Sequence, residues 1–89
     1  MQSIQPIQPT RTMPNGATFE AFLIGDQIRH VRRSKDVSQA TLAKQTGVSV
    51  GWISRIERGL DMPNLPLLIK MAKALQVSVR ELIPRQLPP

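Results

Sequence analysis

The sequence contains no cysteine and only one histidine, His30, among its 89 residues. The absence of cysteine excludes disulfide bonds and thiolate metal sites. With one histidine, no clustered carboxylates and no Gly-rich phosphate loop, the chain offers neither a nucleophile–base pair nor a set of metal ligands. We therefore expect a protein that is not an enzyme and that binds no cofactor and no metal ion.

Long apolar runs are also missing. No segment approaches the roughly 20 apolar residues that a membrane-spanning helix needs, and no signal-peptide pattern precedes the domain. The sequence has no internal repeats, and its length suits one small domain. We expect a cytoplasmic protein with no membrane partner and a modest core, to which dimer formation would add stability.

Acidic residues are few, because six Asp and Glu stand against twelve Lys and Arg, and the net charge is +6. The excess is concentrated in residues 29–58, which carry seven basic side chains and two acidic ones. Such a segment is typical of a nucleic-acid-binding surface, although a merely solvated surface has the same composition. An anionic membrane surface is the weaker alternative, because no helix has the Lys- and Arg-rich amphipathic stripe that this requires.

Three prolines interrupt any helix in residues 1–17, and the other side chains there supply no core. We interpret this segment as an irregular N-terminal arm and residues 85–89 as a short C-terminal tail. The remaining residues, 18–84, form the predicted domain.

The composition of the arm favours a tail without fixed structure. Two other interpretations compete with it. A strand through Ile4 and Ile7 would pair with a partner subunit, and Arg11 would allow the arm to enter a DNA minor groove.

A first helix is predicted over residues 19–34, with Thr18 as its N-cap. Its apolar residues recur at spacings of three and four and form one face. They are Ala21, Ile24, Ile28 and Val31. Gly25 lies inside this helix, where glycine costs about 1 kcal/mol relative to alanine, so we expect a close packing contact at that point.

The segment SQATLAKQTGVSVGWISRIERG, residues 38–59, predicts two short helices around a tight turn. A serine caps the first helix, and Gly47 ends it because the left-handed conformation costs glycine little. Ser49 caps the second helix, which directs Ile53 and Ile56 inward. This is the arrangement of a helix-turn-helix.

A fourth helix is predicted after Asn64, with Pro66 in its first turn. The residues expected to face the core are Leu65, Leu68, Ile69, Ala72 and Leu75. A fifth helix begins at Ser78, which forms a capping box with Glu81, and Pro84 ends it. The predicted fold is all-α, with five helices and the helix-turn-helix at helices 2 and 3.

The combination of SQ, LA, GVS, IS and IERG in this order resembles the helix-turn-helix domains of the phage repressor and Cro family, also called xenobiotic-response-element-type regulators. The resemblance covers roughly residues 22–83. The matching residues are Ile24-Gly25, Ile28-Arg29, Arg32, Ser38-Gln39, Leu42-Ala43, Gly47-Val48-Ser49, Ile53-Ser54, Ile56-Glu57-Arg58-Gly59, Leu68, Leu75, Val77-Ser78 and Glu81-Leu82. It implies a repressor-like fold and a sequence-specific regulator of transcription that binds double-stranded DNA. Most such regulators are dimeric repressors on inverted repeats.

The resemblance also implies a set of base-reading residues on the second motif helix, which enters the major groove. They are Ser49, Val50, Gly51, Ser54 and Arg55. Arg55 is expected to bind guanine through two hydrogen bonds, and Val50 to pack on a thymine methyl group. Well-studied members of the family carry polar residues, often Gln, at the positions of Val50 and Gly51. Direct readout here therefore depends on Arg55 and Ser49, with DNA shape contributing more.

The expected contacts to DNA phosphates are Gln39, Lys44, Trp52 and Arg58. Trp52 is equally well interpreted as a residue that packs on the helix surface, and Lys44 and Arg58 as solvated charges. Family members place an arginine at the end of the first helix against the glutamate of the recognition helix. Arg32 and Glu57 are expected to form this structural pair.

Apolar residues near the C-terminus predict a homodimer interface. They are Leu82, Ile83 and Leu87. Two related functions remain open. An antitoxin would bind DNA through the same domain and a toxin protein through a further segment, and a restriction–modification controller protein would have a similar size. A protein partner is therefore possible, although both terminal segments are short for wrapping a toxin.

Overall fold

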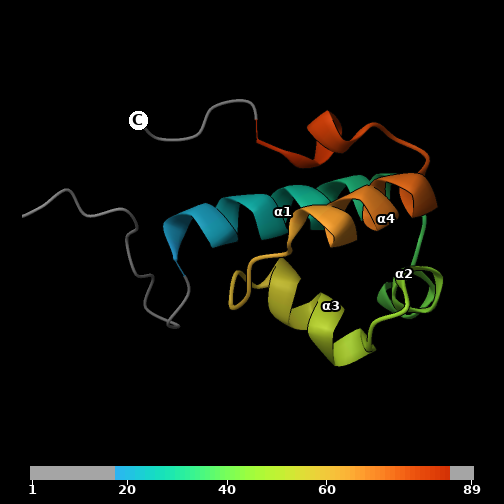
Figure 1. Ribbon diagram of the computed structural model, residues 1–89, viewed down its shortest axis with the longest axis horizontal. Coiled ribbons are helices and arrows are strands. Elements are labelled where there is room, and N and C mark those ends of the chain that lie inside the picture. The colour runs from blue at the N-terminus through green and yellow to red at the C-terminus, as the bar shows by residue number, and fades with distance from the viewer. Residues whose placement is uncertain (1–17, 85–89) are drawn as a thin grey trace, which may run out of the picture.

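The computed structural model describes residues 18–84, which form four α-helices and one short 3-10 turn (Figure 1). The elements are α1 (Phe19–Ser34), α2 (Gln39–Thr46), α3 (Val50–Glu57), α4 (Leu65–Leu75) and the 3-10 turn η1 (Val79–Leu82). No β-strand forms within these residues, so the all-α prediction is confirmed. The arm at 1–17, the tail at 85–89 and Leu87 lie outside the described residues.

The predicted count of five helices is not confirmed, because the fifth is only the four-residue turn η1. Pro84 explains its shortness. The residue before a proline avoids the helical region, and Ile83 adopts an extended conformation with φ −100° and ψ 127°. The chain therefore leaves the helical conformation one residue after Leu82.

Side-chain caps set the beginning of each of the four α-helices, as the sequence predicts. Thr18, Ser38, Ser49 and Asn64 accept hydrogen bonds from the backbone N–H groups of Ala21, Thr41, Trp52 and Leu67, at 2.9–3.1 Å. Such a cap contributes typically about 1 kcal/mol to helix stability. Gly47 ends α2 in the left-handed conformation, with φ 79°. The motif is therefore two well-delimited helices around a short turn.

In Figure 1, α3 lies at the lower edge and η1 at the upper edge, with α1 and α4 between them. Helix α3 contacts α1 and α2, whereas η1 contacts α1 and α4. Buried apolar residues from every element form one core. They are Ile24, Ile28, Val31, Leu42, Ala43, Ile53, Ile56, Leu67, Leu68, Met71, Ala72, Leu75 and Leu82.

The close contact predicted at Gly25 is present, and it joins α1 to the end of α3. A Cβ atom at Gly25 would lie 2.1 Å from the carbonyl oxygen of Ile56 and 2.9 Å from that of Glu57. No side chain fits at such distances, so only glycine allows the two helices to approach this closely. The close packing of α1 against the end of α3 therefore requires glycine at position 25.

The predicted inward face of α4 was partly wrong. Leu65 and Ile69 are 61% and 43% exposed, and Leu67 and Met71 are buried in their place. The sequence of α4, LPLLIKMAKAL, is apolar around much of the helix, so the spacing alone does not fix which side faces inward. Packing against the other helices decides it, and it leaves Leu65 and Ile69 exposed together with Met62.

The side chain of Leu82 is fully buried in the core of its own chain. It is therefore not available to a partner subunit, in contrast to the interface role expected from the sequence. Its burial holds η1 against α1 and α4. Ile83, the next residue, is only partly buried at the edge of the same core.

Candidate nucleic-acid interface

Glu57, the last residue of α3, is 2% exposed, and its carboxylate lies at the centre of a hydrogen-bond network. Arg32 donates from Nε to Oε2 at 2.6 Å and from Nη2 to Oε1 at 3.0 Å. Gln39 donates from Nε2 to Oε1 at 2.9 Å. Arg32 also donates from Nη1 to the carbonyl oxygen of Val37 at 2.8 Å. The network therefore connects α1, the loop after it, the first residue of α2 and the end of α3.

Gln39 was expected at a phosphate, and in the structure one of its amide N–H groups donates to Glu57. An amide nitrogen carries two N–H groups, so a second donor remains at the N-terminal end of α2. The side chain is half-buried. Its orientation is therefore set by the same carboxylate that holds Arg32.

Two residues of α3 and Arg58, the residue that follows it as C-cap, lie opposite the buried side of the helix. Ile53 and Ile56 face the core, whereas Gly51, Arg55 and Arg58 are exposed and follow one another at spacings of four and three. Such spacings place side chains in line on one face of a helix. Two predicted base readers and one predicted phosphate contact thus share a single outward line.

Gly51 is not required by the packing of the protein. A Cβ atom there would meet only the Ser49 hydroxyl oxygen, at 3.9 Å, which is an ordinary contact. The contrast with Gly25 is clear, since that glycine has no space for a side chain. Within residues 18–84, therefore, no packing contact explains why position 51 carries no side chain.

The remaining predicted readers differ in how accessible they are. Val50 is 45% exposed at the first turn of α3. Ser49 is exposed, and its hydroxyl oxygen accepts from the backbone N–H of Trp52 at 3.0 Å. The hydroxyl hydrogen of Ser49 is therefore available as a donor. Ser54 is half-buried, so it is the least accessible member of the set.

The predicted phosphate contacts other than Gln39 are all exposed. Trp52 is 39% exposed and is not part of the core, so its indole is accessible. Lys44 is exposed near the end of α2. Arg58 is exposed and its Nε donates to the carbonyl oxygen of Ser54 at 3.4 Å. All three side chains are therefore accessible at the surface.

One polar contact on this surface has no signature in the sequence. Arg55 forms an ion pair through Nε with Asp61, which lies in the loop between α3 and α4. The two residues are six positions apart, across a helix end and a turn, so no helical spacing indicates the contact. Only the path of the loop after Gly59 brings them together.

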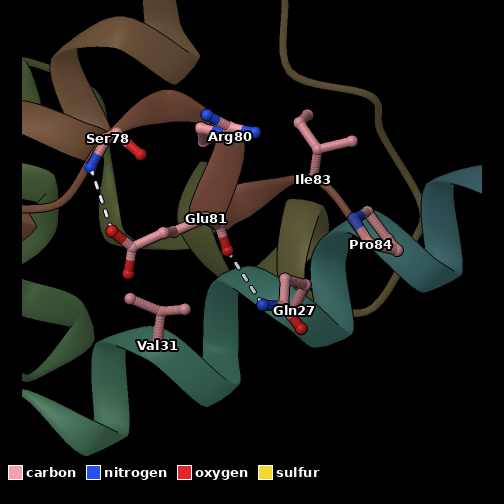
Figure 2. Close-up of a pocket in the computed structure, with 7 residues that line it drawn as sticks. All are labelled: Gln27, Val31, Ser78, Arg80, Glu81, Ile83 and Pro84. Carbon is pink, nitrogen blue, oxygen red and sulfur yellow. Dashed lines mark hydrogen bonds between the residues drawn. The ribbon is translucent and has the colours of Figure 1, made fainter. Parts of the chain in front are cut away.

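A separate open pocket lies between α1 and η1 (Figure 2). Gln27 Nε2 donates across it to the carbonyl oxygen of Glu81 at 2.8 Å, and the side chains of Arg80 and Ile83 also line it. Figure 1 places η1 at the edge of the molecule away from α3. The pocket is therefore not part of the surface formed by α3.

Among the described residues, no group of three or more His, Asp or Glu side chains is placed to hold a metal ion. None of the helices within residues 18–84 is both long and apolar enough to cross a membrane.

Comparison with known proteins matches residues 28–82 to a helix-turn-helix family. The chain belongs to this family. The match begins in α1 and ends with η1, so it includes α2, α3 and the residues that position them. The resemblance to phage repressor and Cro-type regulators is confirmed.

Three relatives illustrate the similarity. The HTH-type transcriptional regulator Rv0474 of Mycobacterium tuberculosis is 44% identical over 61 residues, which are 68% of this chain and 44% of that protein. The crystal structure of the restriction-modification controller protein C.AhdI from Aeromonas hydrophila aligns with TM-score 0.68 and 33% identity, over 71% of this chain and 96% of that one. The c2 repressor of phage P22, in complex with a synthetic operator, aligns with TM-score 0.62 and 40% identity, over 67% and 91%.

The chain thus spans less than half the length of Rv0474 and nearly all of C.AhdI. These relatives are a transcriptional regulator, a controller protein and a repressor, which agrees with the expectation that the chain is not an enzyme.

Proposed function

We propose that this protein regulates transcription by binding specific sequences of double-stranded DNA, with α3 in the major groove. The observation that supports this most strongly is the outward line of Gly51, Arg55 and Arg58 on a helix held by the buried Arg32–Glu57 pair. A recognition helix must present its side chains to base edges in a fixed orientation. The relative from phage P22 is bound to a synthetic operator in its crystal structure, and it aligns with 67% of this chain at 40% identity.

In this proposal, Arg55 reads a guanine through two N–H groups and Val50 packs against a thymine methyl group. Ser49 donates its hydroxyl hydrogen to a base edge, and Ser54 contributes least because it is half-buried. Gly51 leaves space for the DNA to approach the helix closely. Its lack of a side chain is consistent with this use, because the protein itself has space for a Cβ atom there.

Phosphate contacts flank this line in the proposal. Gln39 uses the N–H group that Glu57 leaves available, and the indole N–H of Trp52 donates to the backbone from the first turn of α3. Lys44, near the end of α2, and Arg58, at the end of the line, add positive charge to this surface. These contacts set the position of the protein on the duplex and carry no sequence information.

We further propose that the protein acts as a dimeric repressor on an inverted repeat. The small core and the partly buried Ile83 at its edge support a partner subunit beside η1. Leu82 is excluded from that contact by its burial. Two recognition helices related by a twofold axis would contact half-sites about 34 Å apart, one turn of the double helix.

A restriction–modification controller protein is the second candidate. It is favoured by C.AhdI, because this chain covers 96% of that structure with TM-score 0.68. DNA recovered from the genome with the protein would separate the two roles. Binding upstream of an endonuclease–methyltransferase gene pair would support the controller function, and binding elsewhere would support a repressor of other genes.

Selection of bound duplexes from a random pool tests the proposal. We expect enrichment of an inverted repeat whose half-site centres are one helical turn apart. Enrichment of a single half-site would retain sequence recognition and reject the dimer. A pool that stays random after repeated rounds at moderate salt would contradict sequence-specific binding.

A further inference from the structure

The side chain of Arg55 is held at one edge by a residue outside the recognition helix. Its Nε donates to Oδ2 of Asp61, and this is the only hydrogen bond that the side chain makes within residues 18–84. The Arg55 side chain remains 48% exposed, whereas that of Asp61 is 27% exposed. The carboxylate is thus the more sheltered partner.

The loop that carries Asp61 is fixed on both sides. The backbone N–H of Leu60 donates to the carbonyl oxygen of Arg55 at 2.9 Å, so the chain folds back on the end of α3. Pro63 is buried and Asn64 caps α4, which anchors the loop three residues later. Asp61 therefore reaches Arg55 from a constrained backbone.

The atom that Asp61 binds determines what Arg55 can still do. A guanidinium group has five N–H donors in one plane, and a bond at Nε leaves the two terminal nitrogens available. Those two nitrogens form the edge that can bind O6 and N7 of guanine together. A carboxylate at Nε fixes the plane of the group, so less side-chain freedom is lost when the base is bound.

The charge of Asp61 is otherwise difficult to explain at this position. The chain carries a net charge of +6, and a carboxylate beside Arg55 weakens the attraction of this surface for phosphates. An exposed ion pair also adds little to the stability of the fold. We propose that Asp61 is a positioning residue that sets the base selectivity of Arg55. This inference rests on the proposed function, because it requires Arg55 to read a base.

Two experiments test it, and the first needs no DNA. Nitrogen relaxation at Arg55 Nε in the free protein should report a more restricted group than at Arg33, which is exposed on α1. The restriction should disappear in D61A. Equal mobility of the two arginine side chains in the wild-type protein would overturn the proposal.

The second experiment measures binding to the selected duplex, to the same duplex with the Arg55-dependent base pair replaced, and to a random duplex. We expect D61A to reduce the preference for the selected base pair by about tenfold, part of what a bidentate pair provides. Binding to random DNA should stay equal or become tighter, because a negative charge is removed. D61N keeps an oxygen acceptor without the charge. Its preference for the selected base pair should lie between those of the wild-type protein and D61A.

D26A is the matched control, since Asp26 forms an ion pair with Arg29 on α1 and its removal changes the net charge equally. It should leave the preference unchanged. Tighter binding of D61A to all three duplexes with the preference intact would overturn the proposal and identify Asp61 as a residue that withholds Arg55 from DNA. If the wild-type protein prefers no duplex, the proposed function itself fails, and the positioning role fails with it.

Discussion

Arg32 and Glu57 form a bidentate ion pair that is almost completely buried, with exposed side-chain fractions of 8% and 1%. The pair joins the end of α1 to the end of α3, 25 residues later. Because Gln39 binds the same carboxylate, the first residue of α2 is held in a fixed position relative to α1 and α3. The backbone of α3 is therefore held in place by this buried pair and by Gln39.

Loss of one partner of this pair should destabilise the protein strongly. Arg32→Ala leaves the Glu57 carboxylate buried without its charge partner, and breaking a buried pair in this way costs about 3–5 kcal/mol. Arg33→Ala removes an exposed charge on the same helix and should change the free energy of unfolding by less than about 0.5 kcal/mol. Urea denaturation of both variants compares the two values, and equal midpoints would count against the role of the pair.

The two helical glycines should respond in opposite ways to alanine. Gly25→Ala places a Cβ atom 2.1 Å from the Ile56 carbonyl oxygen, so we expect a protein that unfolds or loses its native packing. In Gly51→Ala the added Cβ atom has open space. This variant should raise the free energy of unfolding by up to about 1 kcal/mol, because alanine has the higher helix propensity.

If close approach of DNA requires Gly51, the same Gly51→Ala variant should bind its operator less tightly despite its greater stability. Thermal unfolding and a binding titration on one preparation measure both quantities. Unchanged operator affinity would show that the missing side chain has no role in recognition.

Leu82 and Ile83 are neighbours in sequence but should give different phenotypes. Leu82→Ala opens a cavity in the core and should cost about 2–5 kcal/mol of unfolding free energy. Ile83 lies at the edge of the core, so Ile83→Glu should mainly shift the sedimentation of the protein from dimer to monomer. A wild-type protein that sediments as a monomer, both at high concentration and on DNA, would reject the dimer.

Binding should weaken steeply as salt increases. If each protomer neutralises about four phosphates, a dimer should give a slope of log K against log salt near −7. Lys44→Ala should make that slope less steep by roughly one per protomer without changing sequence preference. An affinity that does not change between low and moderate salt would contradict the proposed phosphate contacts.

Local rules explain most of what the sequence predicted correctly. The caps Thr18, Ser38, Ser49 and Asn64 and the turn at Gly47 depend on neighbouring residues only, and the structure has all of them. The need for glycine at position 25 could be inferred because a helix interior otherwise disfavours it.

The sequence-based predictions are wrong or incomplete where several helices pack together and where a loop sets a contact. The apolar sequence of α4 permits more than one inward face, so the exposure of Leu65 and Ile69 depends on the helices beside it. Similarly, the burial of Leu82 follows from the way η1 folds back onto α1 and α4. The Arg55–Asp61 contact depends on the path of a loop and has no periodic signature.

In the proposed complex, Arg55 reads a base pair from the outward face of α3. Binding of wild type, Arg55→Ala and Lys44→Ala should be measured on the selected duplex, on single-substituted duplexes and on random DNA. Arg55→Ala should lose about 1–3 kcal/mol on the selected duplex, concentrated at one base pair per half-site, and Lys44→Ala should weaken all duplexes alike. A uniform loss across all duplexes for Arg55→Ala would contradict the claim and leave recognition to Ser49, Val50 and DNA shape.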